Sequence, residues 1–286
     1  MATRTIPSTR NRMVTILVAP LMTCSARLPV FALLIGAFVP PTTVWGPLGL
    51  QGLTLLGLYA LGGGASLVAA AILTRTVLKS ERLPFYMELP SYRIPAAKLL
   101  AGQVWGSTRA FLRRAGTIIL AASIILWFLL TYPETTPPAD LDPSETASYA
   151  LEHSFAGRAG HAIEPLIAPI GFDWKIGVGL IGSLAAREVI VSTLAQVYAA
   201  SDESSSLRGA IRADTDPTTG AAVFDPPTVA SLLVFFVFAL QCFSTIAVMR
   251  RETNSWRWPA FAFTYMFALA YGASFLTYRL VTSLTT

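Results

Sequence analysis

The chain has 286 residues, of which 53% are hydrophobic and only 13% are charged. Soluble globular domains carry about a quarter charged residues, so this composition excludes an ordinary soluble domain and indicates a membrane protein. The formal net charge is +5, but the basic residues flank apolar runs instead of forming a solvated patch, which argues against nucleic-acid binding.

Six apolar stretches are predicted to cross the lipid bilayer, since a helical span needs about 20 mostly apolar residues. The basic start of the chain raises the alternative of a signal peptide, but the first apolar run continues through Val39, beyond any cleavage point, and indicates a retained span. We therefore expect an all-α fold, a polytopic helical bundle in the membrane. The stretches are 13–39, 50–78, 115–132, 175–199, 228–249 and 259–283.

The first stretch, 21-LMTCSARLPVFALLIGAF-38, contains Cys24 and Arg27 three residues apart. Pro20 and Pro29 bracket the pair, and each removes a helix hydrogen bond, so we expect the helix to break here. An arginine inside a span usually faces the bundle interior or water and marks a functional site. Cys24 has two interpretations: a small buried hydrophobe, or a soft ligand for a transition metal.

The segments between the stretches differ in charge and predict their side of the membrane. Residues 79–114 are basic and are expected in the cytoplasm, and residues 133–173 are acidic and are expected outside. Within the basic segment, 96–114 can form an amphipathic helix in the membrane interface. Residues 200–227 are polar and turn-rich, which predicts a loop.

The stretch 175–199 carries Arg187 and Glu188 at its middle. Six simple crossings that start inside would place 250-RRETNSWRW-258 outside, against the positive-inside tendency. A charged pair in mid-stretch favours a broken or re-entrant segment, which returns 250–258 to the inside. Glu188 is the carboxylate within the apolar stretches and therefore the best hard ligand, the alternative being an ion pair that only orients a kink.

The segment 240-LQCFSTIAVMRRET-253 repeats the combination of a cysteine with nearby hydroxyls, at Cys242, Ser244 and Thr245. His153 and His161 match no standard metal spacing and are expected to be solvated. The sequence contains no G-x-x-x-x-G-K-[ST] motif and no nucleophile–base constellation, so no nucleotide-binding and no catalytic residue is assigned.

Five strings spread over nearly the whole chain resemble the C-terminal membrane portion of the ferrous iron transport protein B (FeoB) family of bacteria. The resemblance implies a multi-pass inner-membrane Fe(II) permease with two gate-like halves and broken or re-entrant helices. Residues 1–95 resemble the linking membrane segment, and 96–286 resemble the second, nucleoside-transporter-like gate half. The strings are 2-ATRTIPSTRNRMVTILVAPLMTCSARLPVFAL-33, 88-ELPSYRIP-95, 114-RAGTIILAASIILW-127, 162-AIEPLIAPIGFDWKIGVGLIGSLAAREVIVSTLAQVY-198 and 240-LQCFSTIAVMRRETNSWRWP-259.

The resemblance also implies partners that this sequence does not contain. Family members carry a GTP-binding domain and a first gate half, which we expect on the same or a separate chain, so no GTPase activity is assigned here. Small Feo accessory proteins are further expected partners, and a homo-oligomer is left open.

The predicted function is passage of Fe(II) into the cytoplasm, with Fe(II) as the transported substrate and no permanently bound cofactor. The resemblance points to Cys24 and Cys242 as soft transient ligands and to Glu188 as a hard one, because conduction needs ligands that also release the ion. Two alternatives are kept: a permease for another solute such as a nucleoside, and a truncated or split subunit that does not transport. The other path residues are Ser25, Ser244 and Thr245, and the structural or gating residues are Arg27, Pro20, Pro29 and Arg187.

Overall fold

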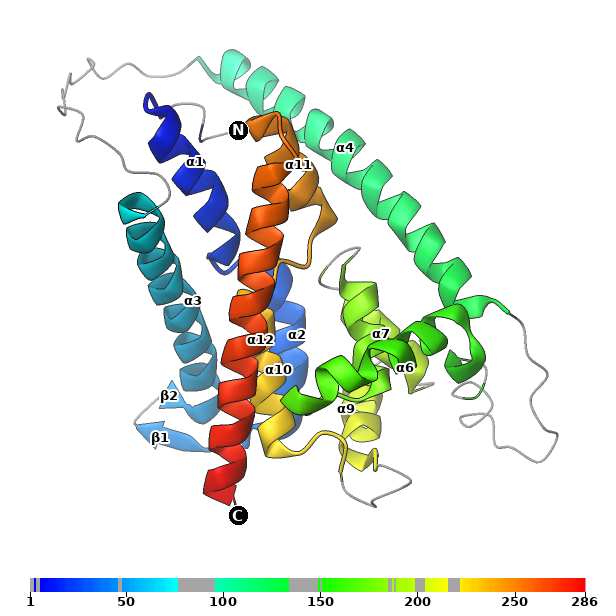
Figure 1. Cartoon of the computed structure of the whole chain (residues 1–286). Helices are drawn as coiled ribbons and strands as arrows, with labels where there is room; N and C mark the ends of the chain where they lie inside the picture. The colour runs from blue at the N-terminus through cyan, green and yellow to red at the C-terminus, as the bar shows by residue number, and fades with distance from the viewer. Residues whose placement is uncertain are drawn as a thin grey trace.

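The fold is described from a computed structural model, which covers residues 3, 6–45, 48–76, 96–133, 149, 151–184, 187, 189–198, 204–215 and 222–285. These residues are almost entirely helical, as Figure 1 shows. One short antiparallel strand pair, β1 (Thr43–Trp45) with β2 (Leu48–Gly49), precedes the second long helix. The prediction of an all-α membrane bundle with broken helices is confirmed.

The helices follow one another with short connections, and several are interrupted by a turn or by 3₁₀ geometry, labelled η. In chain order they are α1 (Thr9–Val18), η2 (Ala19–Leu21), η3 (Ser25–Arg27), α2 (Leu28–Phe38), α3 (Leu50–Arg75), α4 (Ala97–Thr131), α6 (Phe155–Ile167), η4 (Ala168–Ile170), α7 (Trp174–Ser183), α8 (Val189–Val197), α9 (Ser204–Ala213), α10 (Pro226–Phe238), α11 (Phe243–Thr253) and α12 (Arg257–Thr285).

Within the described residues, 4 segments are long and apolar enough to cross a membrane, and they correspond to four of the predicted stretches. Thr9–Phe38 and Pro226–Thr253 each join two helices through a break, whereas α3 and α12 are continuous. The pair α6–η4 and α7 passes the same test together but is bent by 104°, which describes a broken span or a re-entrant loop.

The bend between η4 and α7 depends on a glycine. Gly171 has φ +83°, in the left-handed region, and a Cβ built there would lie 2.3 Å from the Tyr278 ring of α12. Asp173 then starts α7 by accepting a hydrogen bond from the Ile176 amide at 2.8 Å. A left-handed residue followed by an N-cap is an ordinary way to end one helix and start the next in a new direction.

α10 forms the centre of the bundle and packs against α12, α2 and α3. It is apolar on all sides and largely buried, as expected for a core helix. Hydroxyl groups connect it to its neighbours: the Ser231 Oγ donates to the Ile170 carbonyl at 2.8 Å, and the Ser274 Oγ donates to the Ser231 carbonyl at 3.0 Å. Such interhelical hydrogen bonds are typical of membrane bundles, where apolar contact alone does not favour association.

α4 is one continuous helix of 35 residues, about 52 Å long at 1.5 Å per residue. It merges the predicted interfacial helix 96–114 with the predicted span 115–132, and no proline separates the two. Its C-terminal end packs on α6, where the Phe128 and Phe155 rings stack with centroids 6.4 Å apart. Figure 1 shows the rest of α4 running diagonally past the bundle, towards the end where α1 and α11 lie.

α9 corrects the prediction that residues 200–227 form a loop. Leu207 and Ile211, four residues apart, are buried against the core. Arg208 donates to the Ala32 carbonyl of α2 at 3.3 Å, and Arg212 donates to the Ala37 carbonyl near the end of α2. Leu207 and Ile211 pack on the core, and Arg208 and Arg212 bind α2. These tertiary contacts stabilise a helix that the polar composition of the segment does not predict.

The turn between α11 and α12 lies at the same end of the bundle as the start of α1. Arg12 and Glu252 form an ion pair at 2.9 Å that fixes this placement. Figure 1 marks the N-terminus at this end and the C-terminus at the opposite end. The position of the α11–α12 turn beside the start of α1 agrees with the expectation that 250–258 lies on the inner side. The stretch 175–199 is broken as expected, since α7 ends at Ser183 and α8 starts only at Val189.

Candidate functional site

Two crossing segments break at a cysteine. Cys24 lies in extended backbone (φ −104°, ψ 160°) directly before η3, and Cys242 lies in extended backbone (φ −129°, ψ 108°) directly before α11. Proline accounts for the first break, since Pro20 occupies the first turn of η2 and Pro29 the first turn of α2. The second break contains no proline, and hydrogen bonds from another segment account for it.

The second break is stabilised by residues from the break between α7 and α8. A continuous helix would join the Phe243 amide to the Ala239 carbonyl four residues earlier. Instead, the Phe243 amide donates to the Leu184 carbonyl at 3.3 Å, and the Ala239 carbonyl accepts from the Arg187 Nη2 at 3.1 Å. Both groups of the missing helix bond are therefore satisfied from outside, as buried backbone groups require.

Arg187 also contacts the first break. Its Nη1 donates to the Cys24 Sγ at 3.9 Å, and the side chain is buried. One guanidinium thus joins the sulfur of the first cysteine break to a carbonyl of the second. Three breaks that lie far apart in the sequence meet at this residue.

Arg27 stabilises the first break from within. It is fully buried, and its guanidinium donates to the Pro20 carbonyl at 3.3 Å and to the Leu21 carbonyl at 3.5 Å. These carbonyls end η2, where helical partners run out. Arg27 also interacts electrostatically with Arg187 and with Cys24, so two buried cations flank the first cysteine.

The hydroxyls that the sequence singled out lie beside the cysteines. The Cys242 Sγ and the Ser244 Oγ are 2.8 Å apart, and the Thr245 amide donates to the Cys242 carbonyl at 3.1 Å. Cys242 is half-buried and Cys24 is exposed on the surface of this chain, as is Ser25. Glu188, the predicted hard ligand, lies outside the described residues.

Two oxygen atoms next to the cysteines were not singled out by the sequence. The Oγ1 of Thr23 and the Oε1 of Gln241 are buried and have no hydrogen-bond partner within the described residues. Each belongs to the residue directly before a cysteine. Unsatisfied buried oxygens are rare and often mark a place for water or an ion.

α3 lies directly against the first break at one glycine. A Cβ on Gly62 would lie 2.8 Å from the Thr23 Oγ1 and 3.4 Å from a Val237 methyl of α10, whereas one on Gly63 or Gly64 would meet nothing within 4 Å. Gly62 therefore permits the close approach of α3 to both cysteine-bearing segments. Among the described residues, no group of three or more His, Cys, Asp or Glu side chains is placed to hold a metal ion.

Comparisons with known proteins identify the class. Residues 112–256, which contain Arg187 and Cys242, match the sequence profile of the Gate family, described as nucleoside recognition, and the chain belongs to this family. Residues 55–106 match the profile described as the C terminus of ferrous iron transport protein B. The resemblance to the membrane portion of that protein is thereby confirmed.

Curated relatives extend the likeness over nearly the whole chain. The chain is 47% identical over 283 residues to the Fe(2+) transporter FeoB of Leptospira interrogans, covering 98% of this chain and 40% of that protein. It is 40% identical over 309 residues to an Fe(2+) transport protein A/Fe(2+) transporter FeoB fusion protein of Porphyromonas gingivalis, covering 98% and 36%. The Fe(2+) transporter FeoB of Staphylococcus aureus is 34% identical over 281 residues, covering 98% and 38%.

The chain therefore spans about 40% of the length of the first of these relatives. No solved structure gives a significant match to it.

Proposed function

We propose that this chain is the C-terminal membrane part of a transporter that carries Fe(II) across a bacterial inner membrane into the cytoplasm. The observation that carries the proposal is the double contact of Arg187, which brings the Cys24 sulfur and the carbonyl of the Cys242 break to one place. Broken helices with converging carbonyls are the usual ion sites of membrane transporters. Relatives that match 98% of the chain are named Fe(2+) transporters.

The proposed ligands combine soft and hard donors. Thiolates suit a first-row transition metal, and hydroxyl, amide and carbonyl oxygens complete a weak site from which the ion can leave. The sulfur donors are Cys24 and Cys242; the oxygen donors are Ser25, Ser244, Thr245 and Glu188, to which the unpartnered oxygens of Thr23 and Gln241 are added.

Arg187 acts in this proposal as an internal cation. Its guanidinium occupies the place next to a sulfur and a carbonyl where a passing cation would bind. Two like charges this close in a buried site repel each other strongly. Fe(II) therefore passes only when Arg187 moves away, and the described arrangement is the closed one.

The orientation follows from the basic residues. Arg10, Arg12, Arg250 and Arg251 lie in α1 and α11 at the end that the Arg12–Glu252 ion pair joins. The positive-inside tendency places this end in the cytoplasm. The far end of α12 then lies on the outer side.

The chain is proposed to have two parts, of which the second pairs with further domains. Residues 1–95 form a linking membrane segment and 96–286 form a gate half, which pairs with a first gate half and is regulated by a GTPase domain. A small accessory protein is a further partner, a proposal supported by the printed name of the Porphyromonas gingivalis relative, a fusion with Fe(2+) transport protein A.

The test is anaerobic uptake of radioactive Fe(II) by bacteria that lack their own ferrous uptake and express the protein with its partners. Replacing both Cys24 and Cys242 with Ser should lower uptake at unchanged membrane abundance. Ser283→Ala, at the exposed end of α12, is the matched control and should leave uptake unchanged. Undiminished uptake in the double variant would refute the cysteine path.

A second candidate is a nucleoside permease, which the description of the Gate family favours. Competition with Fe(II) uptake distinguishes the iron transporter from the nucleoside permease. Mn(II) or Co(II) should compete with Fe(II) uptake and nucleosides should not, whereas direct uptake of a radioactive nucleoside would favour the second candidate.

A further inference from the structure

α4 carries a basic face that the proposed transport path does not use. The helix contains Lys98, Arg109, Arg113 and Arg114 and no Asp or Glu. At 3.6 residues per turn, Lys98, Trp105, Arg109 and Arg113 fall within about 80° of one another around the helix axis. Three of the four basic residues and one indole thus share a face.

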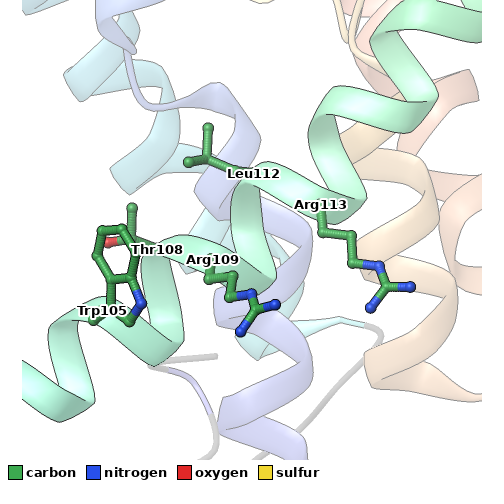
Figure 2. Close-up of a pocket in the computed structure, with 5 residues that line it drawn as sticks. All are labelled: Trp105, Thr108, Arg109, Leu112 and Arg113. Atoms are coloured by element: carbon green, nitrogen blue, oxygen red, sulfur yellow. The ribbon is translucent and has the colours of Figure 1, made fainter.

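Figure 2 shows how these side chains lie. Arg109 and Arg113 extend to the same side of α4, one turn apart, and Leu112 points away from them. Together with Trp105 and Thr108 they line a hollow of about 440 Å³. All of the lining residues come from this one helix, so the hollow is an open surface of α4.

The exposed residues around this hollow are suited to contact with the lipid bilayer. Trp105 and Leu112 are 70% and 63% exposed, and apolar Leu100 and Val104 are exposed on the other side of the helix. The same helix continues without interruption into the apolar residues 117–131. A basic, aromatic-bearing turn joined to an apolar run is held at the level of the lipid headgroups.

We propose that Arg109 and Arg113, with Trp105 beside them, bind the phosphate of an anionic phospholipid headgroup. A guanidinium presents a fork of donors that matches a phosphate, and two of them one turn apart can share its oxygens. Trp105 places its ring at the headgroup level, and the lack of acidic residues on α4 leaves the attraction to the anion unopposed. An acidic partner protein would have to displace lipid from the same depth, so lipid is the favoured occupant.

Native mass spectrometry of the purified full chain in detergent tests this with phosphatidylglycerol and phosphatidylcholine as probes. The chain should bind phosphatidylglycerol in preference to phosphatidylcholine, and less so as salt is raised. Arg109→Gln with Arg113→Gln should weaken phosphatidylglycerol binding about 30-fold, since each basic residue near an anionic surface contributes about a fivefold preference. Arg109→Lys with Arg113→Lys keeps the charge but loses the fork of donors, so it should bind phosphatidylglycerol more weakly than the unaltered chain and more tightly than the glutamine variant, which separates lost charge from misfolding.

Arg279→Gln is the matched control, because Arg279 is an exposed arginine in the last turns of α12, and Figure 1 shows the C-terminal end of α12 at the opposite end of the bundle from α11. This variant should leave binding unchanged. Phosphatidylglycerol binding that survives in the double glutamine variant would overturn the proposal. So would equal binding of phosphatidylcholine, which indicates an apolar site, or full competition by inorganic phosphate, which indicates an anion site without lipid. Displacement of the lipid by an acidic partner domain at equal concentration would also overturn it.

Discussion

Arg187 shows how one side chain can create a break that backbone propensity does not predict. The segment 239–242 contains neither proline nor glycine, and it opens because the Ala239 carbonyl and the Phe243 amide find partners in the segment 184–187. The sequence indicated Cys24, Arg27 and Arg187 as site candidates, since charged and sulfur-bearing residues stand out in apolar stretches. It did not indicate Thr23 or Gln241, because an unpaired oxygen is a property of the packed structure.

The internal-cation role of Arg187 predicts the effect of removing its charge. Arg187→Gln should strengthen Fe(II) binding to the purified chain by at least about tenfold, since like charges about 4 Å apart repel by ~4 kcal/mol at an effective dielectric of 20. Arg187→Lys keeps the charge and should bind Fe(II) as weakly as the unaltered chain. Anaerobic equilibrium dialysis measures both, and equal affinities in the two variants would contradict the role.

At the scale of elements, apolar stretches are easy to predict and their interruptions are not. The stretches 13–39, 50–78, 228–249 and 259–283 correspond to the segments able to cross the membrane. Prolines predicted the first break, and a charged pair predicted the break before α8. The helix α9 was missed because its stability comes from Leu207, Ile211 and two arginines bound to α2, contacts that polar composition does not reveal.

The contact of α3 with the first break predicts a difference between neighbouring glycines. Gly62→Leu should lower the free energy of unfolding by about 1–3 kcal/mol, because its side chain would overlap the Thr23 Oγ1 and push α3 off the break. Gly64→Leu, two residues on, has open space and should be neutral or slightly stabilising, since leucine favours a helix more than glycine does. Thermal unfolding in detergent compares them, and equal midpoints would show that α3 does not pack closely here.

At the scale of the whole molecule, the bent α6–α7 pair decides the topology. The Arg12–Glu252 ion pair joins the basic turn between α11 and α12 to the start of α1, so an even number of crossings separates the two. With the predicted span 115–132 of α4 counted as a crossing, the α6–α7 pair is re-entrant and does not cross. The sequence left the side of the C-terminus open, because charge alone could not show whether 175–199 crosses the membrane. The ion pair supplies the missing long-range contact.

This topology predicts the labelling of two introduced cysteines. In a chain with Cys24→Ser and Cys242→Ser, Ser255→Cys should react with a membrane-impermeant maleimide from the cytoplasmic side and Leu284→Cys from the outer side. Inverted vesicles and spheroplasts present the two sides separately, and the parent chain without cysteine is the control. Labelling of both positions from one side would require a different number of crossings.

The central claim is that the two cysteine-bearing breaks hold Fe(II) through sulfur. Anaerobic X-ray absorption at the iron edge, on the purified chain loaded with Fe(II), tests it most directly. We expect sulfur among the atoms bound to iron in the unaltered chain, and only oxygen or nitrogen in the variant with Cys24→Ser and Cys242→Ser. Iron bound by oxygen and nitrogen alone in the unaltered chain would contradict the account.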